Sequence, residues 1–158
     1  MILLNNILVA TDFGPAADAA LIYGRALAQT FGSRLHLLHV MENSFLRSTP
    51  ADPHAHKAAL LRRLHDHVTA EDCAALKAHL VLETSDNAAD AIANYAKATN
   101  IDLIVIGTNG RGAVAQVLVG SVAERVVRIA SCPVLTVRHP EREFVLPDTL
   151  AVGTNAGG

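Results

Sequence analysis

The sequence predicts a single doubly wound α/β domain with a five-stranded parallel sheet and helices on both faces. Five short aliphatic runs alternate with segments whose small or apolar residues recur at helical spacing. The runs are unbroken, which is typical of strands that are buried on both faces. Parallel neighbours require crossover connections, and the helical segments between the runs can supply them. The 158 residues suffice for one domain with a sizeable core.

Each element has its own local signals. The expected strands are residues 7–10, 35–40, 79–82, 103–106 and 133–137. Pro15 suits the first turn of the first helix and Gly32 suits its end, while Ser85 or Asp86 is expected to cap the third helix. The second and fourth helices are expected around residues 60–68 and 121–130. The polar stretch 43–53 is expected to be a loop, long enough to act as a lid.

Composition excludes several classes of protein. Hydrophobic residues make up 51%, charged residues 18% and the net charge is −2, which argues against disorder and against general DNA coating. Aromatic residues at 4% leave little material for stacking on single-stranded nucleic acid. No stretch approaches the roughly 18 apolar residues of a membrane span. Cys73 and Cys132 show no sign of pairing, so we expect a cytoplasmic protein that contacts neither nucleic acid nor membrane.

A glycine-rich loop follows the fourth expected strand. It reads Gly107-Thr108-Asn109-Gly110-Arg111-Gly112, and Gly120-Ser121 opens the next helix. Uncovered backbone N–H groups and a helix N-terminus favour an anion such as phosphate, and Arg111 adds a full positive charge. The alternative interpretation is that these glycines serve only tight turns. The spacing is neither that of a Walker loop nor that of a dinucleotide fingerprint.

Ligands of doubly wound sheets bind beyond the carboxyl ends of the strands. Asp12 follows the first strand, and its carboxylate has two interpretations: it accepts hydrogen bonds from a ribose hydroxyl, or it caps the N–H groups near 15–17. A receiver domain is disfavoured because Asp12 has no acidic neighbour and Glu83 stands where a phosphoacceptor Asp is needed.

The histidines and nucleophiles assemble into no recognisable catalytic or metal centre. His54 and His56, like His65 and His67, are two residues apart, which places them on different faces of a helix. No Ser-His-Asp set or activated cysteine is evident, so we assign no catalytic residue and no metal ligand.

Four segments together make the chain similar to the universal stress protein family over about residues 3–138. They are Ile7-Leu8-Val9-Ala10-Thr11-Asp12, Leu37-Leu38-His39-Val40, Asp102-Leu103-Ile104-Val105-Ile106-Gly107-Thr108 and Ser131-Cys132-Pro133-Val134-Leu135-Thr136-Val137. The spacing Gly107-x2-Gly110-x9-Gly120-Ser121 resembles the nucleotide motif of the ATP-binding branch of that family. Asn109 and Ser85 depart from the residues that are frequent in the family.

The resemblance implies the strand order 3-2-1-4-5 and an ATP site between the first and fourth strands. The residues that match the family's site are Ala10, Thr11, Asp12, Val40, Gly107, Gly110, Arg111, Gly120, Ser121 and Val122. We expect ATP with Mg²⁺ as the ligand and at most slow hydrolysis, because no Walker lysine or second cationic clamp is present.

The resemblance also implies a homodimer through the fifth strand, an edge strand that would otherwise be a pairing hazard. We expect residues 1–138 to form the nucleotide-binding domain and 139–158 to form a C-terminal tail. The expected role is that of a nucleotide-responsive stress or signalling protein with an unidentified protein partner. Two alternatives remain open. One is a nucleotide-independent dimeric interaction protein of the same fold. The other is an enzyme that attacks the α-phosphate of ATP, which is the less favoured of the two because the sequence shows no second substrate domain.

Overall fold

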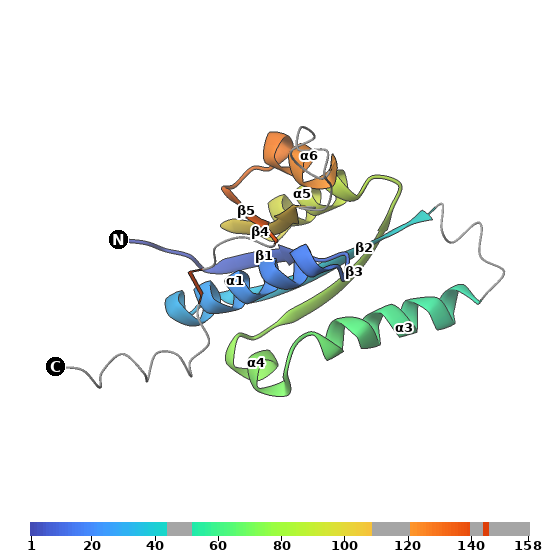
Figure 1. Cartoon of the computed structure of the whole chain (residues 1–158), viewed down its shortest axis with the longest axis horizontal. Coiled ribbons are helices and arrows are strands. Elements are labelled where there is room, and N and C mark those ends of the chain that lie inside the picture. Colours follow the sequence, from blue (N-terminus) through green and yellow to red (C-terminus); the bar gives the residue numbers. More distant parts are fainter. Residues whose placement is uncertain (44–51, 109–120, 140–143, 146–158) are drawn as a thin grey trace.

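The computed structural model describes residues 1–43, 52–108, 121–139 and 144–145. Figure 1 shows strands and helices alternating along the chain, with a central sheet between two layers of helices. The elements are β1 (Asn6–Ala10), α1 (Pro15–Phe31), β2 (Arg34–Glu42), α3 (Pro53–Asp66), α4 (Ala70–Ala75), β3 (His79–Ser85), α5 (Ala88–Ala98), β4 (Leu103–Thr108), α6 (Ser121–Ile129) and β5 (Val134–Arg138).

The strands form one five-stranded parallel sheet in the order β3-β2-β1-β4-β5. The central strand β1 pairs with β2 on one side, where Val9 lies opposite Leu37, and with β4 on the other, where Val9 lies opposite Val105. The predicted fold class and strand order are therefore confirmed. Because the chain crosses from β1 to β2 in one direction and reaches β4 in the other, the order reverses beside β1.

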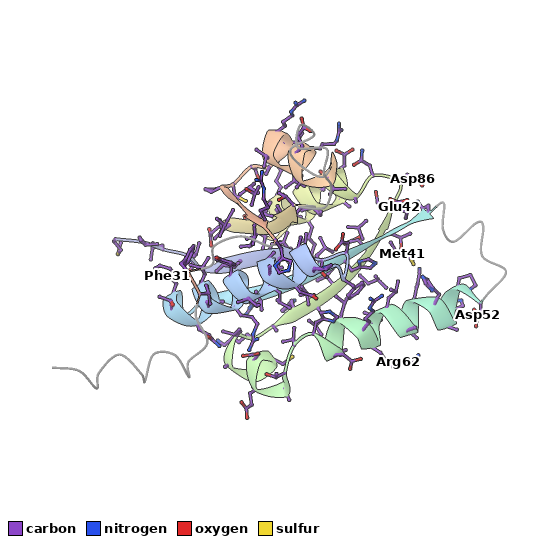
Figure 2. The ribbon with its side chains drawn as sticks, in the orientation of Figure 1. Phe31, Met41, Glu42, Asp52, Arg62 and Asp86 are labelled. Carbon is purple, nitrogen blue, oxygen red and sulfur yellow. The ribbon has the colours of Figure 1, made fainter. Side chains whose placement is uncertain are left out.

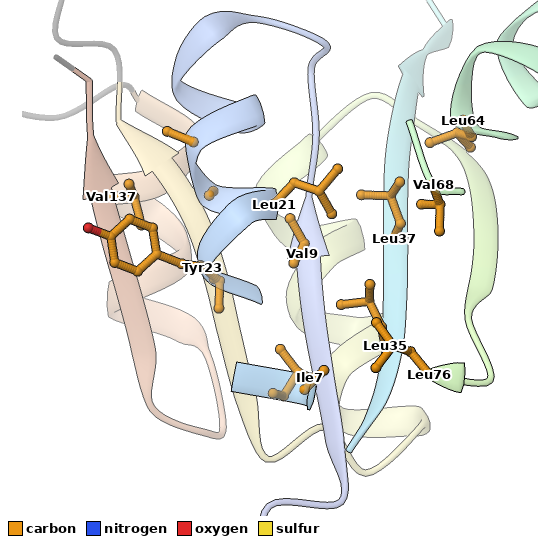
Figure 3. Packing of buried hydrophobic residues seen from close by; sticks show 14 residues of the cluster. Ile7, Val9, Leu21, Tyr23, Leu35, Leu37, Leu64, Val68, Leu76 and Val137 are labelled. Carbon is orange, nitrogen blue, oxygen red and sulfur yellow. The ribbon is translucent and has the colours of Figure 1, made fainter. Parts of the chain in front are cut away.

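Successive residues of β1 face opposite layers, and this alternation creates two cores. Ile7 and Val9 face α1 and the residues around α3 and α4, where Leu64 and Val68 pack (Figure 3). On the other face, Leu8 packs with residues of α5 and α6, such as Ile92 and Val126. Since both faces are covered by apolar side chains, the strands read as unbroken aliphatic runs.

The ends of α1 follow the predicted signals, whereas the start of α5 differs. Pro15 is the first residue of α1, and Gly32 ends it with a φ of 66°, in the left-handed region that glycine adopts without strain. The expected cap of the third predicted helix, Ser85 or Asp86, is wrong: Asn87 is the N-cap of α5 and its side chain accepts a hydrogen bond from the Asp90 amide. The Ser85 hydroxyl instead bonds with the backbone of Asn87.

Two further boundaries differ from the sequence prediction. Most of the expected loop 43–53 lies outside the described residues, and its last residue, Pro53, begins α3 with Asp52 as the N-cap. A short helix that the sequence pattern did not predict, α4, follows, and the Thr69 side chain caps it. The buried Asp72 of α4 forms an ion pair with Arg25 of α1, which joins the two helices.

Among the described helices, none combines the length and apolar character needed to cross a membrane.

Gly107 lies within β4, not in the loop that follows it, and it packs against the start of α1. A Cβ atom at this position would lie 2.4 Å from the carbonyl carbon and oxygen of Ala16 and 2.8 Å from the Ala17 nitrogen. These are backbone atoms, which cannot rotate away as the end of a side chain would. Glycine is therefore needed here for close approach of helix and strand, which brings the first turn of α1 to the end of the sheet.

Candidate functional site

A cavity of about 280 Å³ opens where the carboxyl ends of β1, β2 and β4 meet the first turns of α1, α5 and α6. This is the place beside β1 where the strand order reverses, at which doubly wound sheets bind ligands. The cavity is lined by Ala10, Thr11, Asp12, Ala16, Ala17, Leu38, His39, Val40, Glu42, Ala88, Ile92, Ile106, Gly107, Val122 and Ala123.

The lining has an apolar part and a polar part. Leu38, Ile92 and Ile106 are buried in the core that faces α5 and α6, so they offer a ligand an apolar surface. Asp12 and Glu42, both exposed, contribute carboxylates at the ends of β1 and β2. Figure 2 shows Glu42 at the tip of β2. A pocket with mostly apolar walls and a few polar groups is typical of small-molecule sites.

Helix N-termini converge on the cavity. Ala16 and Ala17 belong to the first turn of α1, Ala88 begins α5, and Val122 and Ala123 belong to the first turn of α6. The first amides of a helix have no acceptor within the helix, and they carry the positive end of its dipole. In α1 the N-cap residue is a glycine and no side chain caps the first turn. The arrangement therefore favours an anionic group in or beside the cavity.

The turn between β1 and α1 is held by side chains of its own residues. The Gly14 amide donates a hydrogen bond of 2.8 Å to Oδ1 of Asp12, and the Phe13 amide donates one of 3.0 Å to Oγ1 of Thr11. The Asp12 carboxylate thus orders the turn. The interpretation in which Asp12 caps the first turn of α1 is wrong, because no side chain caps that turn. Because a carboxylate accepts several hydrogen bonds, Asp12 retains acceptor capacity for a ligand.

His39 of β2 joins this turn to the sheet. Its Nδ1 lies 2.8 Å from the backbone oxygen of Thr11, and since a carbonyl only accepts, Nδ1 carries the hydrogen and donates it. The ring of His39 also lies against Phe13, with 4.5 Å between ring centroids. Both His39 and Thr11 line the cavity, so this hydrogen bond fixes part of its wall.

The structure brings together those predicted site residues that it describes in full. Ala10, Thr11, Asp12, Val40, Gly107 and Val122 all line the cavity. Gly110, Arg111 and Gly120 lie outside the described residues, and Ser121 is the first residue of α6, with a side chain outside the described set.

Sequence reasoning missed several lining residues. His39 and Glu42 flank Val40 on β2, and the carboxyl-end rule already pointed to that position, so both polar side chains were within reach of the same argument. Ala88 and Ile92 of α5 gave no signal beyond helical periodicity. Within the described ranges, no three His, Cys, Asp or Glu side chains gather closely enough to hold a metal ion.

Comparison with known proteins gives the family. The model of the universal stress protein family matches residues 4–138. A universal stress protein of Thermus aquaticus is 36% identical over 140 residues, which cover 86% of this chain and 100% of the relative. A second match, to a universal stress protein of Methanocaldococcus jannaschii, is 47% identical over 55 residues and spans only 32% of that relative.

Solved structures agree with this assignment. The universal stress protein UspA from Lactobacillus plantarum is 30% identical, with a TM-score of 0.62 over 87% of this chain and 100% of that protein. Two others share the fold: a universal stress protein in complex with cAMP (24% identical, TM-score 0.61, covering 85% and 97%) and one from Archaeoglobus fulgidus in complex with dAMP (19% identical, TM-score 0.59, covering 87% and 99%). With the family model matched from residue 4 to residue 138, this chain belongs to the universal stress protein family.

Proposed function

We propose that this protein binds an adenine nucleotide, ATP with Mg²⁺, in the cavity between β1 and β4, and that it acts as a nucleotide-responsive protein in stress or signalling. The observation that carries the proposal is the cavity itself. Its apolar wall, its carboxylates and the helix N-termini lie at the one edge of the sheet where ligands of this architecture bind.

The cavity suits the nucleoside part of the ligand. Its volume of about 280 Å³ is close to the lower end of small-molecule sites, about 300 Å³. The apolar wall around Leu38, Val40 and Ile92 offers a surface for the adenine ring. Asp12 offers a carboxylate to a ribose hydroxyl, as acidic residues of nucleotide sites do. The relatives solved with cAMP and dAMP hold ligands that share adenine on a phosphorylated pentose, which supports the same class for this chain.

The phosphates would lie towards the N-terminus of α6. Val122 and Ala123 belong to its first turn and line the cavity, and the glycine motif of the sequence precedes that turn. A helix N-terminus stabilises a nearby negative charge by about 0.3–1 kcal/mol at exposed sites. Mg²⁺, when bound, neutralises phosphate charge and prefers oxygen ligands, of which Asp12 and Glu42 are the carboxylates in the described lining.

Titration with ATP tests the site. In Asp12→Asn the amide oxygen still accepts the Gly14 hydrogen bond, whereas Asp12→Ala removes both the charge and that bond. We expect wild type to bind ATP·Mg²⁺ and both variants to bind about 10- to 150-fold more weakly, since a hydrogen bond to a charged group contributes about 1.5–3 kcal/mol. Asp86→Asn, at an exposed carboxylate outside the cavity lining, is the control.

Isothermal titration calorimetry measures these affinities, and mass spectrometry of the freshly purified protein identifies any bound nucleotide. If wild type neither carries a nucleotide nor responds to ATP, the proposal fails and the nucleotide-independent interaction protein becomes the better account. If Asp12→Asn binds like wild type, the ribose role of Asp12 fails. ADP release far slower than the typical enzyme turnover of about 10 s⁻¹ is expected from a site that binds rather than hydrolyses.

We also propose a homodimer through β5. It is an edge strand of the sheet, paired with β4 on one side, and unpaired strand edges promote association. Thr136→Lys places a charge on this exposed edge, and Thr84→Lys places the same charge on β3, the opposite edge. We expect sedimentation velocity to show a dimer for wild type and Thr84→Lys and a monomer for Thr136→Lys. A monomeric wild type would contradict the proposal.

The proposed location is the cytoplasm, where the dimer would present its nucleotide state to a protein partner. Cys73 and Cys132 are free, as thiols are in a reducing compartment. Cell fractionation tests the location directly.

A further inference from the structure

Phe13 adopts a backbone conformation that is unfavourable for a bulky residue. Its φ is 63°, in the left-handed region. Its ring lies against three side chains from two other elements: His39 of β2 at 4.5 Å and His67 at 5.3 Å between centroids, and the guanidinium carbon of Arg63 at 4.3 Å from the ring centroid. A strained residue persists only where its surroundings hold it, and these contacts are such surroundings.

The same turn forms a wall of the cavity. Phe13 lies directly after Thr11 and Asp12, and these two residues line the cavity. Its amide is bonded to Oγ1 of Thr11, the Thr11 carbonyl accepts from His39, and the Asp12 carboxylate accepts from Gly14. The Phe13 ring therefore sits on a turn whose backbone is held by three separate hydrogen bonds, and one of these is accepted by the Asp12 carboxylate.

The other side of the Phe13 contact is α3, which also packs on β3. Among the described residues of α3, Leu64 is the one buried side chain. At its C-terminal end, His67 Nδ1 donates to the Arg63 carbonyl at 2.8 Å, and His67 Nε2 lies 3.4 Å from the Asp18 carboxylate of α1. The contact of Arg63 and His67 with Phe13 is thus one part of the docking of this helix, beside the burial of Leu64 and the packing on β3.

We propose that Phe13, packed against Arg63 and His67, is a positioning residue that couples the docking of α3 to the geometry of Asp12 in the nucleotide site. This inference rests on the proposed nucleotide binding. Coupling of this kind is reciprocal: α3 docking strengthens nucleotide binding, and a bound nucleotide stabilises α3 docking by the same factor.

Arg63→Ala tests the coupling because it removes the guanidinium and leaves the backbone carbonyl that His67 uses. Arg62→Ala is the matched control: it is the adjacent exposed arginine of the same helix (Figure 2). Phe13→Asn removes the ring, yet asparagine tolerates the left-handed conformation, so any loss belongs to the ring. Phe13→Tyr keeps the ring and is the conservative rescue.

The readouts are the ATP·Mg²⁺ dissociation constant and hydrogen exchange of α3 with and without ATP. We expect Arg63→Ala to weaken binding about two- to fivefold, the range of an exposed cation–π contact. Phe13→Asn should weaken it about tenfold, while Phe13→Tyr and Arg62→Ala bind like wild type. ATP should slow exchange in α3 of wild type and of Arg62→Ala, and this protection should be lost in Phe13→Asn. Equal affinities together with an unresponsive α3 would overturn the coupling.

A third readout separates the coupling from the proposed function. In ligand-free protein, amide exchange at residues 12–14 should be faster in Arg63→Ala than in Arg62→Ala. If wild type fails to bind ATP, the proposed function falls, and this exchange still decides the coupling: equal rates in the two variants refute it. Thermal melts of each variant show whether it is folded, and Arg63→Ala, an exposed surface change, keeps the test available if Phe13→Asn does not fold.

Discussion

Replacing Gly107 by alanine tests how the sheet and α1 approach each other. The added Cβ would lie 2.4 Å from the carbonyl carbon and oxygen of Ala16, whereas carbon contacts are most favourable at about 3.5–4.0 Å. Helix and strand must therefore separate locally by about 1 Å. Overpacking of this kind costs about 1–3 kcal/mol, and we place Gly107→Ala near the upper end because the opposing atoms are backbone.

Differential scanning calorimetry measures the effect. For a domain of this size, 1 kcal/mol shifts Tm by about 2–4 °C, so the expected drop is about 4–12 °C. Gly32→Ala is the control: its φ of 66° makes alanine strained, yet nothing lies within 4 Å of the added Cβ. It should cost about 1–2 kcal/mol, the backbone penalty alone. A Gly107→Ala protein with a Tm equal to that of wild type would refute the packing account of this glycine.

Two further predictions concern buried ionisable side chains. Burial, with smaller effects from His79 and Arg34, lowers the pKa of His36 to about 4, so the folded state resists protonation between about pH 6.5 and 4 and loses stability as pH falls through that window. The loss from pH 7 to 5 should be about 2 kcal/mol in urea unfolding and should disappear in His36→Gln; parallel pH profiles would contradict this. Arg25→Ala leaves the buried Asp72 without its ion-pair partner and should lower the free energy of unfolding by about 2–3 kcal/mol in the same assay. Arg128→Ala, in an exposed pair, should lower it by less than about 0.5 kcal/mol. Equal losses in the two variants would contradict the role of burial.

The strands could be predicted because their information is local, whereas their order in the sheet came from the family resemblance. Each strand is an aliphatic run, and Pro15 and Gly32 mark the ends of α1 by properties that do not depend on the rest of the chain. The features that escaped prediction depend on close competitors or on distant partners. Ser85, Asp86 and Asn87 are all good capping residues, and only the backbone path at the end of β3 selects Asn87. The short helix α4 is stabilised by its contact with Arg25, which lies on α1.

Some residues of the candidate site could likewise be predicted from the sequence, and others could not. Asp12, Val40 and Gly107 were found because the carboxyl ends of parallel strands must share one edge. The cluster around Phe13 was not found, because its members come from the turn between β1 and α1, from β2 and from the C-terminal end of α3, and are brought together only by the fold. The two-residue spacing of His65 and His67 placed them on different helix faces, and the structure shows His67 at the end of α3 in contact with Phe13 and Asp18.

Gly107 has a packing role that is independent of any ligand, so its presence alone does not indicate nucleotide binding. Its close contact with Ala16 and Ala17 is a sufficient reason for a glycine at this position, whether or not a nucleotide binds. A chain of this fold that lost its ligand would therefore still need Gly107. Asp12 differs, because Asp12→Asn preserves the hydrogen bond that its side chain accepts from Gly14, while removing the charge that a ligand would meet. Nucleotide binding in this fold is therefore better tested at Asp12 than at the first glycine of the motif.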